Sequence, residues 1–266
     1  MSAKILGIIP ARYASTRFPG KPLVHIMGKT LLQRTYENAT KAKVFDQIIV
    51  ATDDYRIMEH TKAFGGQAIL TSSDCLTGTD RIAEVLELHP HLTAAQIIVN
   101  IQGDEPCVSP VAIHQMVQLL LDDASAQVAT VVTYLKNAID ASNPAIVKCI
   151  IDRHCNAIYF SRALIPNNKE QKFDPSQTYY HHIGIYAYRP DFIQLYQKLA
   201  PTPLQLAESL EQLKILEHGY RIKVAITEQP SFGVDTPEDI HKVEQWLCKQ
   251  NTFLSLEESA PHLAKG

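Results

Sequence analysis

Residues 4–23 read KILGIIPARYASTRFPGKPL, so that a short apolar run passes directly into a loop of small and basic residues. The apolar run, residues 5–9, has the length of a buried strand and is too short for a membrane span or a signal-peptide core. Runs of the same kind recur along the chain, and stretches with the spacing of amphipathic helices lie between them. The predicted strands are residues 5–9, 47–52, 67–70, 96–101 and 128–134, and the predicted helices are residues 30–43, 54–64, 80–88 and 110–122.

This alternation predicts the α/β class, with a doubly wound, mainly parallel sheet and right-handed crossovers. In such sheets ligands bind outside the carboxyl ends of the strands, so the loops that follow strands are expected to carry the chemistry. The pattern changes in residues 145–190, where short strands joined by polar stretches indicate a smaller antiparallel section. A helical segment at 204–219, a strand at 221–228 and a last helix with Thr236 as N-cap and Pro237 as its first residue complete the pattern.

The chain has 266 residues, of which 45% are hydrophobic, and this suits one α/β domain in residues 1–250 followed by a polar tail in residues 251–266. The net charge of −3 provides no basic field, so a nucleic-acid polymer is not an expected partner. No apolar stretch is long enough to insert into a membrane, which favours a cytoplasmic protein. The five cysteines include no C-x-x-C pair, which fits reduced thiols better than disulfides or a zinc site.

The loop after the first predicted strand brings Arg12, Arg17 and Lys21 into one short segment. Arginine forks, a lysine ammonium and free backbone N–H groups can neutralise a nucleoside triphosphate and a departing pyrophosphate. A basic surface loop with no ligand explains the composition equally well. The segment matches neither the Walker A motif nor G-x-G-x-x-G, and this disfavours a Rossmann dehydrogenase.

Two aspartates stand where a metal ion could bind. Asp104 follows the predicted strand 96–101 in the segment NIQGDEP, and Asp235 precedes the last predicted helix. Each also has a purely structural reading, as a residue that shapes a turn or caps a helix. Two carboxylates together with phosphate oxygens and water can complete the octahedron that Mg²⁺ requires.

The segment TSSDCLTGTDRIAEV, residues 71–85, joins a predicted strand to a helix. Gly78 permits close approach of a ligand, Thr79 is the predicted cap of the helix, and Arg81 falls in its first turn. A basic residue in the first turn opposes the helix dipole, which suggests contact with a ligand rather than a solvent-exposed position.

Several segments resemble one family. The spelling P-A-R-x-x-S-x-R-x-x-G-K-P of residues 10–22 resembles the opening signature of the sugar cytidylyltransferases, and PARYASTRFPGKPL is similar to the form found in those that act on 3-deoxy-manno-octulosonate (Kdo). The segments QGDEP, YFSR, HHIGIY, LEQLK and GVDTPED are similar to motifs of the same family in the same order, from about Ile5 to about Trp246. Two departures are TGTDR in place of SGTER, and Lys214 in place of an arginine, which removes the expectation of a two-bond fork there.

The resemblance implies a role for each matching residue. Without it, Glu211 and Gln212 would be read as a solvated helix face, His182 as a strand histidine and Tyr186 as part of the core. The implied catalytic residues are Arg12, Lys21, Asp104 and Asp235, of which Asp104 and Asp235 would bind Mg²⁺. The implied nucleotide-binding residues are Pro10, Ala11, Arg12, Arg17, Lys21, Gly78, Thr79, Arg81 and Gln102, and the implied sugar-binding residues are Arg162, His182, Tyr186, Glu211 and Gln212.

The resemblance also implies a fold like that of the nucleotide-diphospho-sugar transferases, a homodimer formed through the antiparallel section, and a reaction. That reaction joins CTP and Kdo to give CMP-Kdo and pyrophosphate, for lipopolysaccharide assembly in Gram-negative organisms. One alternative is a cytidylyltransferase for sialate or another 2-keto-acid sugar. An alternative of another class is a non-catalytic nucleotide-binding protein.

Overall fold

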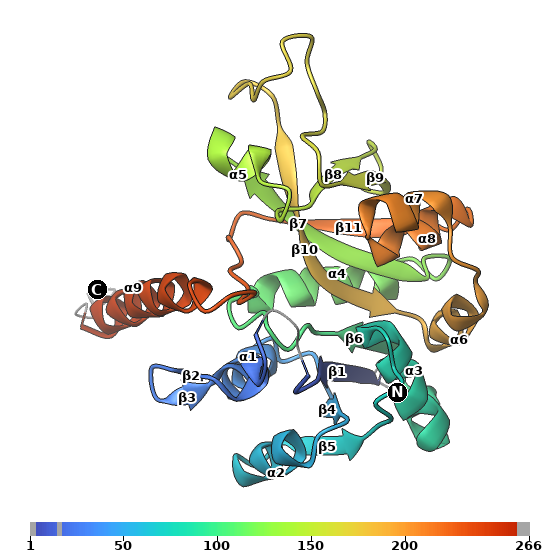
Figure 1. The fold of residues 1–266 in the computed structure, drawn as a ribbon, viewed down its shortest axis with the longest axis vertical. Coiled ribbons are helices and arrows are strands. Elements are labelled where there is room, and N and C mark those ends of the chain that lie inside the picture. Colours follow the sequence, from blue (N-terminus) through green and yellow to red (C-terminus); the bar gives the residue numbers. More distant parts are fainter. Residues whose placement is uncertain (1–3, 15–17, 260–266) are drawn as a thin grey trace, which may run out of the picture.

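The computed structural model describes residues 4–14 and 18–259, with side chains through Gln250. Its centre is a nine-stranded sheet (Figure 1), in which seven strands follow the order β11–β7–β10–β6–β1–β4–β5. Along this path β10 is antiparallel to β6 and β7, and the other neighbours are parallel. The strands are β1 (Ile5–Ala11), β4 (Gln47–Thr52), β5 (Gln67–Leu70), β6 (Ile97–Asn100), β7 (Val128–Leu135), β10 (Tyr179–Tyr188) and β11 (Ile222–Thr227), with β8 (Lys148–Ile151) and β9 (Ala157–Ser161) attached beside β10.

Helices cover both faces of the sheet and enclose two apolar cores. Helices α1, α2 and α4 pack on one face, and α3, α6 and α8 pack on the other. The helices are α1 (Leu31–Thr40), α2 (Tyr55–Ala63), α3 (Gly78–Leu88), α4 (Pro110–Asp122), α5 (Ala138–Ser142), α6 (Pro190–Lys198), α7 (Pro203–Glu208), α8 (Glu211–Glu217) and α9 (Asp239–Ser259). Short elements are the 3₁₀ turns η1 (Lys21–Leu23) and η2 (Pro90–Ala94) and the hairpin β2 (His25–Ile26) and β3 (Lys29–Thr30).

The predicted fold class is confirmed, because the five apolar runs of the first half form β1, β4, β5, β6 and β7. Ile8 and Ile9 show why these strands read as continuous apolar runs. They are neighbours in β1, so they point to opposite faces of the sheet, yet both are fully buried. The antiparallel section is also present, as β8, β9 and β10.

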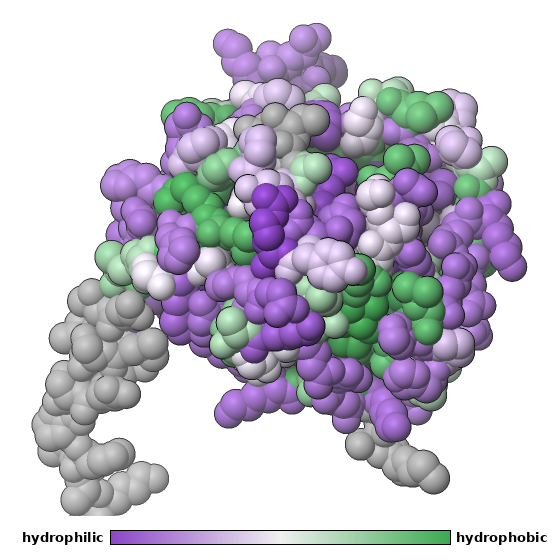
Figure 2. Space-filling view, turned by 60° about the horizontal axis from the view of Figure 1, so that its bottom comes forward, coloured by the Kyte–Doolittle hydropathy of each residue, from purple (hydrophilic) through white to green (hydrophobic). Residues whose placement is uncertain are grey.

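The surface differs in composition from these cores. Figure 2 shows one face of the molecule, on which hydrophilic residues predominate and hydrophobic residues form separate small patches. Most large apolar side chains lie instead between the helices and the sheet. Within the described part of the chain, no helix is both long enough and apolar enough to cross a bilayer.

The predicted helix 204–219 is two helices, α7 and α8. The break is at Ser209, whose φ of 52° lies in the left-handed region and ends α7. Nothing in the periodic sequence of this segment signals the break, because serine is not the residue that usually adopts this conformation. The break turns the first residues of α8 toward the sheet.

The last helix differs from its prediction at both ends. It begins at Asp239, so Thr236 is not its N-cap, and it continues to Ser259, through most of the predicted tail. The carboxylate of Asp239 accepts hydrogen bonds from the backbone N–H groups of Asp235 and Thr236 and from the Thr236 hydroxyl. These bonds fold residues 235–238 into a turn that precedes the helix, and Asp235 lies at the start of this turn.

Lys148 of β8 is a fully buried cation that holds the antiparallel section together. Its ammonium donates hydrogen bonds to the backbone carbonyls of Asn143, Ile146 and Arg162, at 2.9, 2.6 and 2.6 Å. Burial, with a smaller effect from the nearby Arg162, lowers the pKa of Lys148. The three carbonyls satisfy all three N–H donors, which is what allows a lysine to be buried here.

We expect Lys148→Met to lower the free energy of unfolding by about 2–4 kcal/mol, because three carbonyls would lose their shared donor inside the protein. Lys198→Met, which replaces an exposed lysine of α6, is the control and is expected to stay within about 0.5 kcal/mol of the wild type. Equilibrium urea denaturation measures both values. Equal stability of the two variants would contradict the structural role of Lys148.

Candidate active site

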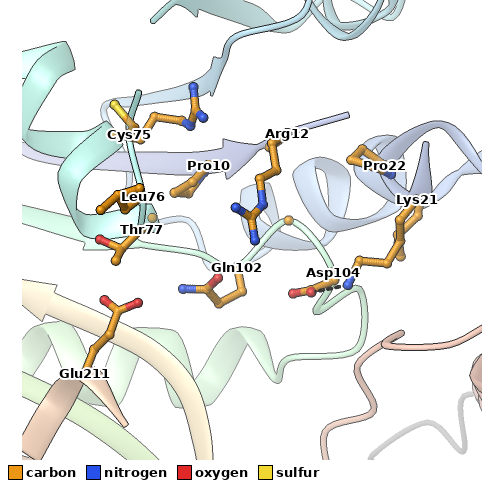
Figure 3. A pocket seen from close by; sticks show the side chains of 15 residues that line it. Pro10, Arg12, Lys21, Pro22, Cys75, Leu76, Thr77, Gln102, Asp104 and Glu211 are labelled. Carbon is orange, nitrogen blue, oxygen red and sulfur yellow. Dashed lines mark hydrogen bonds and ion pairs between the residues drawn. The ribbon is translucent and has the colours of Figure 1, made fainter. Parts of the chain in front are cut away.

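A cavity of about 260 Å³ lies at the carboxyl ends of β1 and β6 (Figure 3), where the doubly wound fold is expected to bind ligands. Its walls come from the end of β1, the loop that follows, the start of α3, the turn after β6 and the start of α8. The residues that line it are Pro10, Ala11, Arg12, Lys21, Pro22, Leu31, Cys75, Leu76, Thr77, Gly78, Arg81, Gln102, Gly103, Asp104 and Glu211.

The turn after β6 approaches β1 closely because residue 103 is glycine. A Cβ atom at Gly103 would lie 2.9 Å from the carbonyl oxygen of Pro10, a distance that side-chain atoms do not tolerate. The Thr35 hydroxyl donates a hydrogen bond of 3.1 Å to the carbonyl of Gly103 and fixes the turn from α1. Asp104 is thereby held beside the end of β1.

Lys21, Asp104 and Asp235 meet at one end of this cavity. The ammonium of Lys21 lies 2.5 Å from the Asp104 carboxylate and 3.7 Å from that of Asp235, and it donates a 2.8 Å hydrogen bond to the carbonyl of Val234. The Lys21 side chain is 12% exposed, whereas those of Asp104 and Asp235 are 33% and 50% exposed. Both carboxylates are therefore more exposed to a ligand than the lysine between them, which nevertheless lines the cavity.

The donor set at this point suits Mg²⁺. Within the described residues no three histidine, cysteine or acidic side chains form a complete metal cage. Two carboxylates that leave most coordination positions to phosphate oxygens and water match the way in which Mg²⁺ is usually held. Asp104 and Asp235 therefore fit a magnesium ion that arrives with a nucleotide.

The loop that precedes Lys21 closes on itself through its backbone. The N–H of Gly20 donates to the carbonyl of Tyr13 at 2.9 Å, and the φ of Gly20, 72°, requires a residue that tolerates the left-handed region. Arg12 is exposed and its side chain extends into the cavity, toward the turn that carries Gln102 (Figure 3). Arg17, the third predicted phosphate-binding residue, lies outside the described residues.

The start of α3 forms the opposite wall, and its cap is Thr77 rather than Thr79. The Thr77 hydroxyl accepts from the N–H of Asp80 and the Asp80 carboxylate accepts from the N–H of Thr77, which makes a capping box. Thr79 is two residues further along the chain, and its hydroxyl lies 3.5 Å from the Glu211 carboxylate. The capping box fixes Thr77 and Gly78 at the edge of the cavity.

Arg81 has partners within the protein. Its guanidinium is buried, and it donates to the Asp53 carboxylate at 3.1 Å, to the Thr71 hydroxyl at 2.5 Å and to the carbonyl of Ser72. The ion pair with Asp53 thus offsets the unfavourable interaction between the positive charge of Arg81 and the dipole of α3. Arg81 lines the cavity, but its first role in the described structure is to hold the loop that begins at Thr71.

A second cavity, of about 300 Å³, adjoins the first and shares three lining residues with it, Gly78, Gln102 and Glu211. Four of the predicted sugar-binding residues meet here. Burial raises the pKa of the Glu211 carboxyl, with a further effect from Asp80. The remaining lining residues are Thr79, Asn100, Val147, His182, Gly184, Tyr186, Tyr188, Tyr196, Ser209, Leu210, Gln212 and Ile215.

The polar groups of this second cavity are buried and largely neutral. Burial, with a smaller effect from His181, lowers the pKa of His182 to about 3, so its imidazole is uncharged at neutral pH. The hydroxyl of Tyr186 is buried and has no hydrogen-bond partner in the described structure. A buried hydroxyl without a partner costs free energy, so its presence on a cavity wall suggests that a ligand supplies the partner.

Arg162 does not line either cavity. Its guanidinium donates to the backbone carbonyls of Glu208 at 2.8 Å, Pro144 at 3.0 Å and Ser209 at 3.4 Å. The Glu208 carboxylate in turn accepts from the N–H of Arg162 and from the Ser161 hydroxyl. In this arrangement Arg162 fastens the break between α7 and α8 to the end of β9, and its role in sugar binding stays a prediction.

Sequence reasoning missed Glu105, the neighbour of Asp104. Its carboxyl accepts a 2.8 Å hydrogen bond from Ser231, a residue 126 positions further along the chain. Burial, reinforced by the charge of Asp104, raises the pKa of Glu105 to about 7. The only signal in the sequence is its place next to Asp104, because its partner becomes apparent only in the folded chain.

The comparisons with known proteins agree with this geometry. Residues 6–223 match the family model described as cytidylyltransferase. The 3-deoxy-manno-octulosonate cytidylyltransferase of Protochlamydia amoebophila is 62% identical over 254 residues, which are 96% of this chain and 98% of that protein. The protein of Arabidopsis thaliana with that name, designated mitochondrial, is 47% identical over 94% of this chain and 85% of its own length.

A solved structure of CMP:2-keto-3-deoxy-manno-octonic acid synthetase complexed with CTP superposes with a TM-score of 0.85 at 38% identity. It covers 93% of this chain and 100% of its own. The cavity at the ends of β1 and β6, the paired aspartates and the sequence similarity over nearly the whole chain lead to one assignment. The chain belongs to the cytidylyltransferases and, within them, to the 3-deoxy-manno-octulosonate cytidylyltransferase (CMP-Kdo synthetase) family.

Proposed function

We propose that this protein transfers CMP from CTP to Kdo and releases pyrophosphate. The observation that carries the proposal is the pair of adjoining cavities, one with basic and acidic side chains and one with buried neutral polar groups, which share Gly78, Gln102 and Glu211. A nucleotide in the first cavity and a sugar in the second would meet at these shared residues. Reaction between two substrates requires this kind of contact.

The residues of the first cavity suit a triphosphate. Arg12 can form two parallel hydrogen bonds to phosphate oxygens, and Lys21 supplies a compact positive charge. Negative charge accumulates on the pyrophosphate as it leaves, so cations fixed beside it stabilise the transition state more than the ground state. The anomeric hydroxyl of Kdo would attack the α-phosphorus in line with the departing group.

Asp104 and Asp235 would hold Mg²⁺ beside the phosphates. When bound, the ion supplies charge that neutralises phosphate oxygens and lowers the pKa of a coordinated hydroxyl. Lys21 lies between the two carboxylates and reduces their mutual repulsion before the nucleotide arrives. No covalent nucleophile is needed, since a direct displacement requires only orientation and charge neutralisation.

The second cavity suits a sugar with several hydroxyl groups. His182 and Gln212 are buried polar side chains on its wall, and the Tyr186 hydroxyl has no hydrogen-bond partner among the described residues. Neutral groups of this kind bind hydroxyls and would leave partners unsatisfied with a smaller or differently shaped sugar. These groups support Kdo as the acceptor, and the similarity to the 3-deoxy-manno-octulosonate cytidylyltransferases supports lipopolysaccharide assembly as the destination of the product.

A second copy of the chain is the proposed partner. Just before the antiparallel section in the chain, Ile139 of α5 is 84% exposed and Tyr134 of β7 is 38% exposed. Large apolar side chains at one surface favour burial between two copies of the chain. The proposed compartment is the cytoplasm, although the Arabidopsis relative is named as mitochondrial.

The first test is a pyrophosphate-release assay with the four nucleoside triphosphates and a panel of acidic sugars. We expect release with CTP and Kdo, and far slower release with UTP or N-acetylneuraminate. Turnover of N-acetylneuraminate at least as fast as that of Kdo would transfer the assignment to the sialate enzymes. Absence of release with every sugar would favour the non-catalytic alternative.

Lys21→Ala is expected to reduce kcat by about 10²–10³-fold, since it removes one electrostatic donor from the transition state. The matched control is Lys29→Ala, which removes an exposed lysine of the nearby hairpin that pairs with Glu37. Steady-state kinetics and thermal unfolding of both variants make the comparison. Near wild-type turnover of Lys21→Ala would mean that the loop is only a basic turn.

Asp104→Asn and Asp235→Asn are each expected to fold normally and to lose most activity, because an amide keeps the shape and removes the charge that binds a hard cation. Electron paramagnetic resonance of Mn²⁺ added with CTP should show weaker binding in both variants and unchanged binding in the control Asp123→Asn. EDTA should abolish turnover of the wild type reversibly.

Two results would contradict this mechanism. One is ordinary activity of either aspartate variant at ordinary Mg²⁺ concentration. The other is a cytidylyl-enzyme adduct in the mass spectrum of the quenched reaction, since direct displacement forms none.

A further inference from the structure

Gly233 lies against the carboxyl group of Glu105. A Cβ atom at Gly233 would be 2.8 Å from Glu105 Oε1 and 3.2 Å from its Cδ, and the next atom, the carbonyl oxygen of Asp104, is 3.5 Å away. The φ of Gly233 is outside the left-handed region, so its backbone could accommodate alanine. The obstacle to a side chain at position 233 is therefore Glu105 itself.

Two further contacts join the same two segments. The Ser231 hydroxyl donates a 2.8 Å hydrogen bond to Glu105, and the N–H of Val234 donates a 2.9 Å hydrogen bond to the carbonyl of Asp104. Residues 231–235 are thus docked on residues 104 and 105 by a side-chain hydrogen bond from Ser231, before Gly233, and a backbone hydrogen bond from Val234, after it. Asp235 is the next residue after this docked segment.

The underside of the contact is apolar. Val234 and Cys107 are each 1% exposed and belong to a small core with residues of β2, α1 and α9. Apolar packing is not directional, so it holds the segment down without fixing its position along the turn. A hydrogen bond to a carboxyl group is directional and can fix that position.

We infer that Glu105 is a positioning residue that docks residues 231–235 onto the turn after β6 and so sets the place of Asp235 relative to Asp104 and Lys21. It does not line the cavity, so it acts through the segment and not on a substrate. The inference rests on the proposed function only in its second part, that this placement matters for the metal ion. Its first part, the docking, is a property of the folded chain alone.

Hydrogen exchange of the full-length protein tests the docking. In Glu105→Ala we expect the Val234 amide to exchange at least about tenfold faster than in the wild type, the factor typical of losing one hydrogen bond to a charged or polar acceptor. Glu105→Gln keeps an acceptor for Ser231 and should restore slow exchange. Glu59→Ala, an exposed acidic residue of α2, is the control. Unchanged exchange in Glu105→Ala overturns the inference.

A double-mutant cycle tests the contact with Gly233. Gly233→Ala should speed exchange of the Val234 amide in the wild-type background and should have a much smaller effect in Glu105→Ala, where the obstructing carboxyl group is gone. Equal effects in both backgrounds would mean that glycine is needed at position 233 for another reason, and would count against the inference.

A third experiment tests whether the docking affects the metal site. It measures Mn²⁺ binding in the presence of saturating CTP by electron paramagnetic resonance. Glu105→Ala should raise the dissociation constant of Mn²⁺ about tenfold while CTP binding in EDTA stays unchanged, and Glu105→Gln should restore the wild-type value. If Glu105→Ala weakened both the binding of Mn²⁺ and the binding of CTP in EDTA, the site as a whole would be damaged, and this result would overturn the positioning role. If Asp104→Asn and Asp235→Asn bind Mn²⁺ as the wild type does, the proposed metal site fails, and hydrogen exchange still decides whether Glu105 docks the segment.

Discussion

The candidate site depends on the ion pairs that the Lys21 ammonium forms with two carboxylates. The ammonium lies 2.5 Å from Asp104 and 3.7 Å from Asp235, and it also donates to the carbonyl of Val234. Three segments that are far apart in the chain, the loop after β1, the turn after β6 and the turn before α9, therefore converge on one positive charge. Without that charge, two partly exposed carboxylates would repel each other, so the cation assembles the site.

A small apolar core supports this ionic contact from below. Val24 follows Lys21 closely, Cys107 follows Asp104, and Val234 precedes Asp235, and all three pack in the same cluster with residues of α9. Each charged residue thus has an apolar neighbour in sequence that anchors it. This arrangement explains why α9 contributes to the site although it lies at one side of the sheet (Figure 1). It also explains how a site with two half-exposed carboxylates can be fixed in position.

The sequence predicts those parts of the structure that depend on local pattern. Strands buried on both faces have to be apolar throughout, so β1, β4 and β6 are recognisable within two residues of their bounds. Parallel strands also end at one edge, which predicts that the loops after the strands carry the chemistry, and both Lys21 and Asp104 lie in such loops. By contrast, the break at Ser209 and the docking of Glu105 depend on residues remote in sequence, Arg162 and Ser231, so no local pattern could reveal them.

The antiparallel strand β10 carries His182, whose hydrogen bonds affect which groups the second cavity can bind. Its pairing with β7 shifts register between Ile183 and Tyr186, and the Thr130 hydroxyl fills the irregularity by donating to the carbonyl of Ile185 at 2.8 Å. That hydroxyl has one hydrogen, so its 3.0 Å contact with Nε2 of His182 requires the imidazole to be the donor.

Because His182 is neutral, a proton on Nε2 leaves Nδ1 as an acceptor. A neutral acceptor binds a hydroxyl donor and gives no attraction to a carboxylate, whose oxygens only accept. In the proposed complex His182 therefore selects a hydroxyl of the sugar, and the sugar carboxylate has to be recognised by other groups. The tautomer of His182 thus depends on the hydroxyl that fills the irregularity in β10, which is the only antiparallel strand along the described seven-strand path.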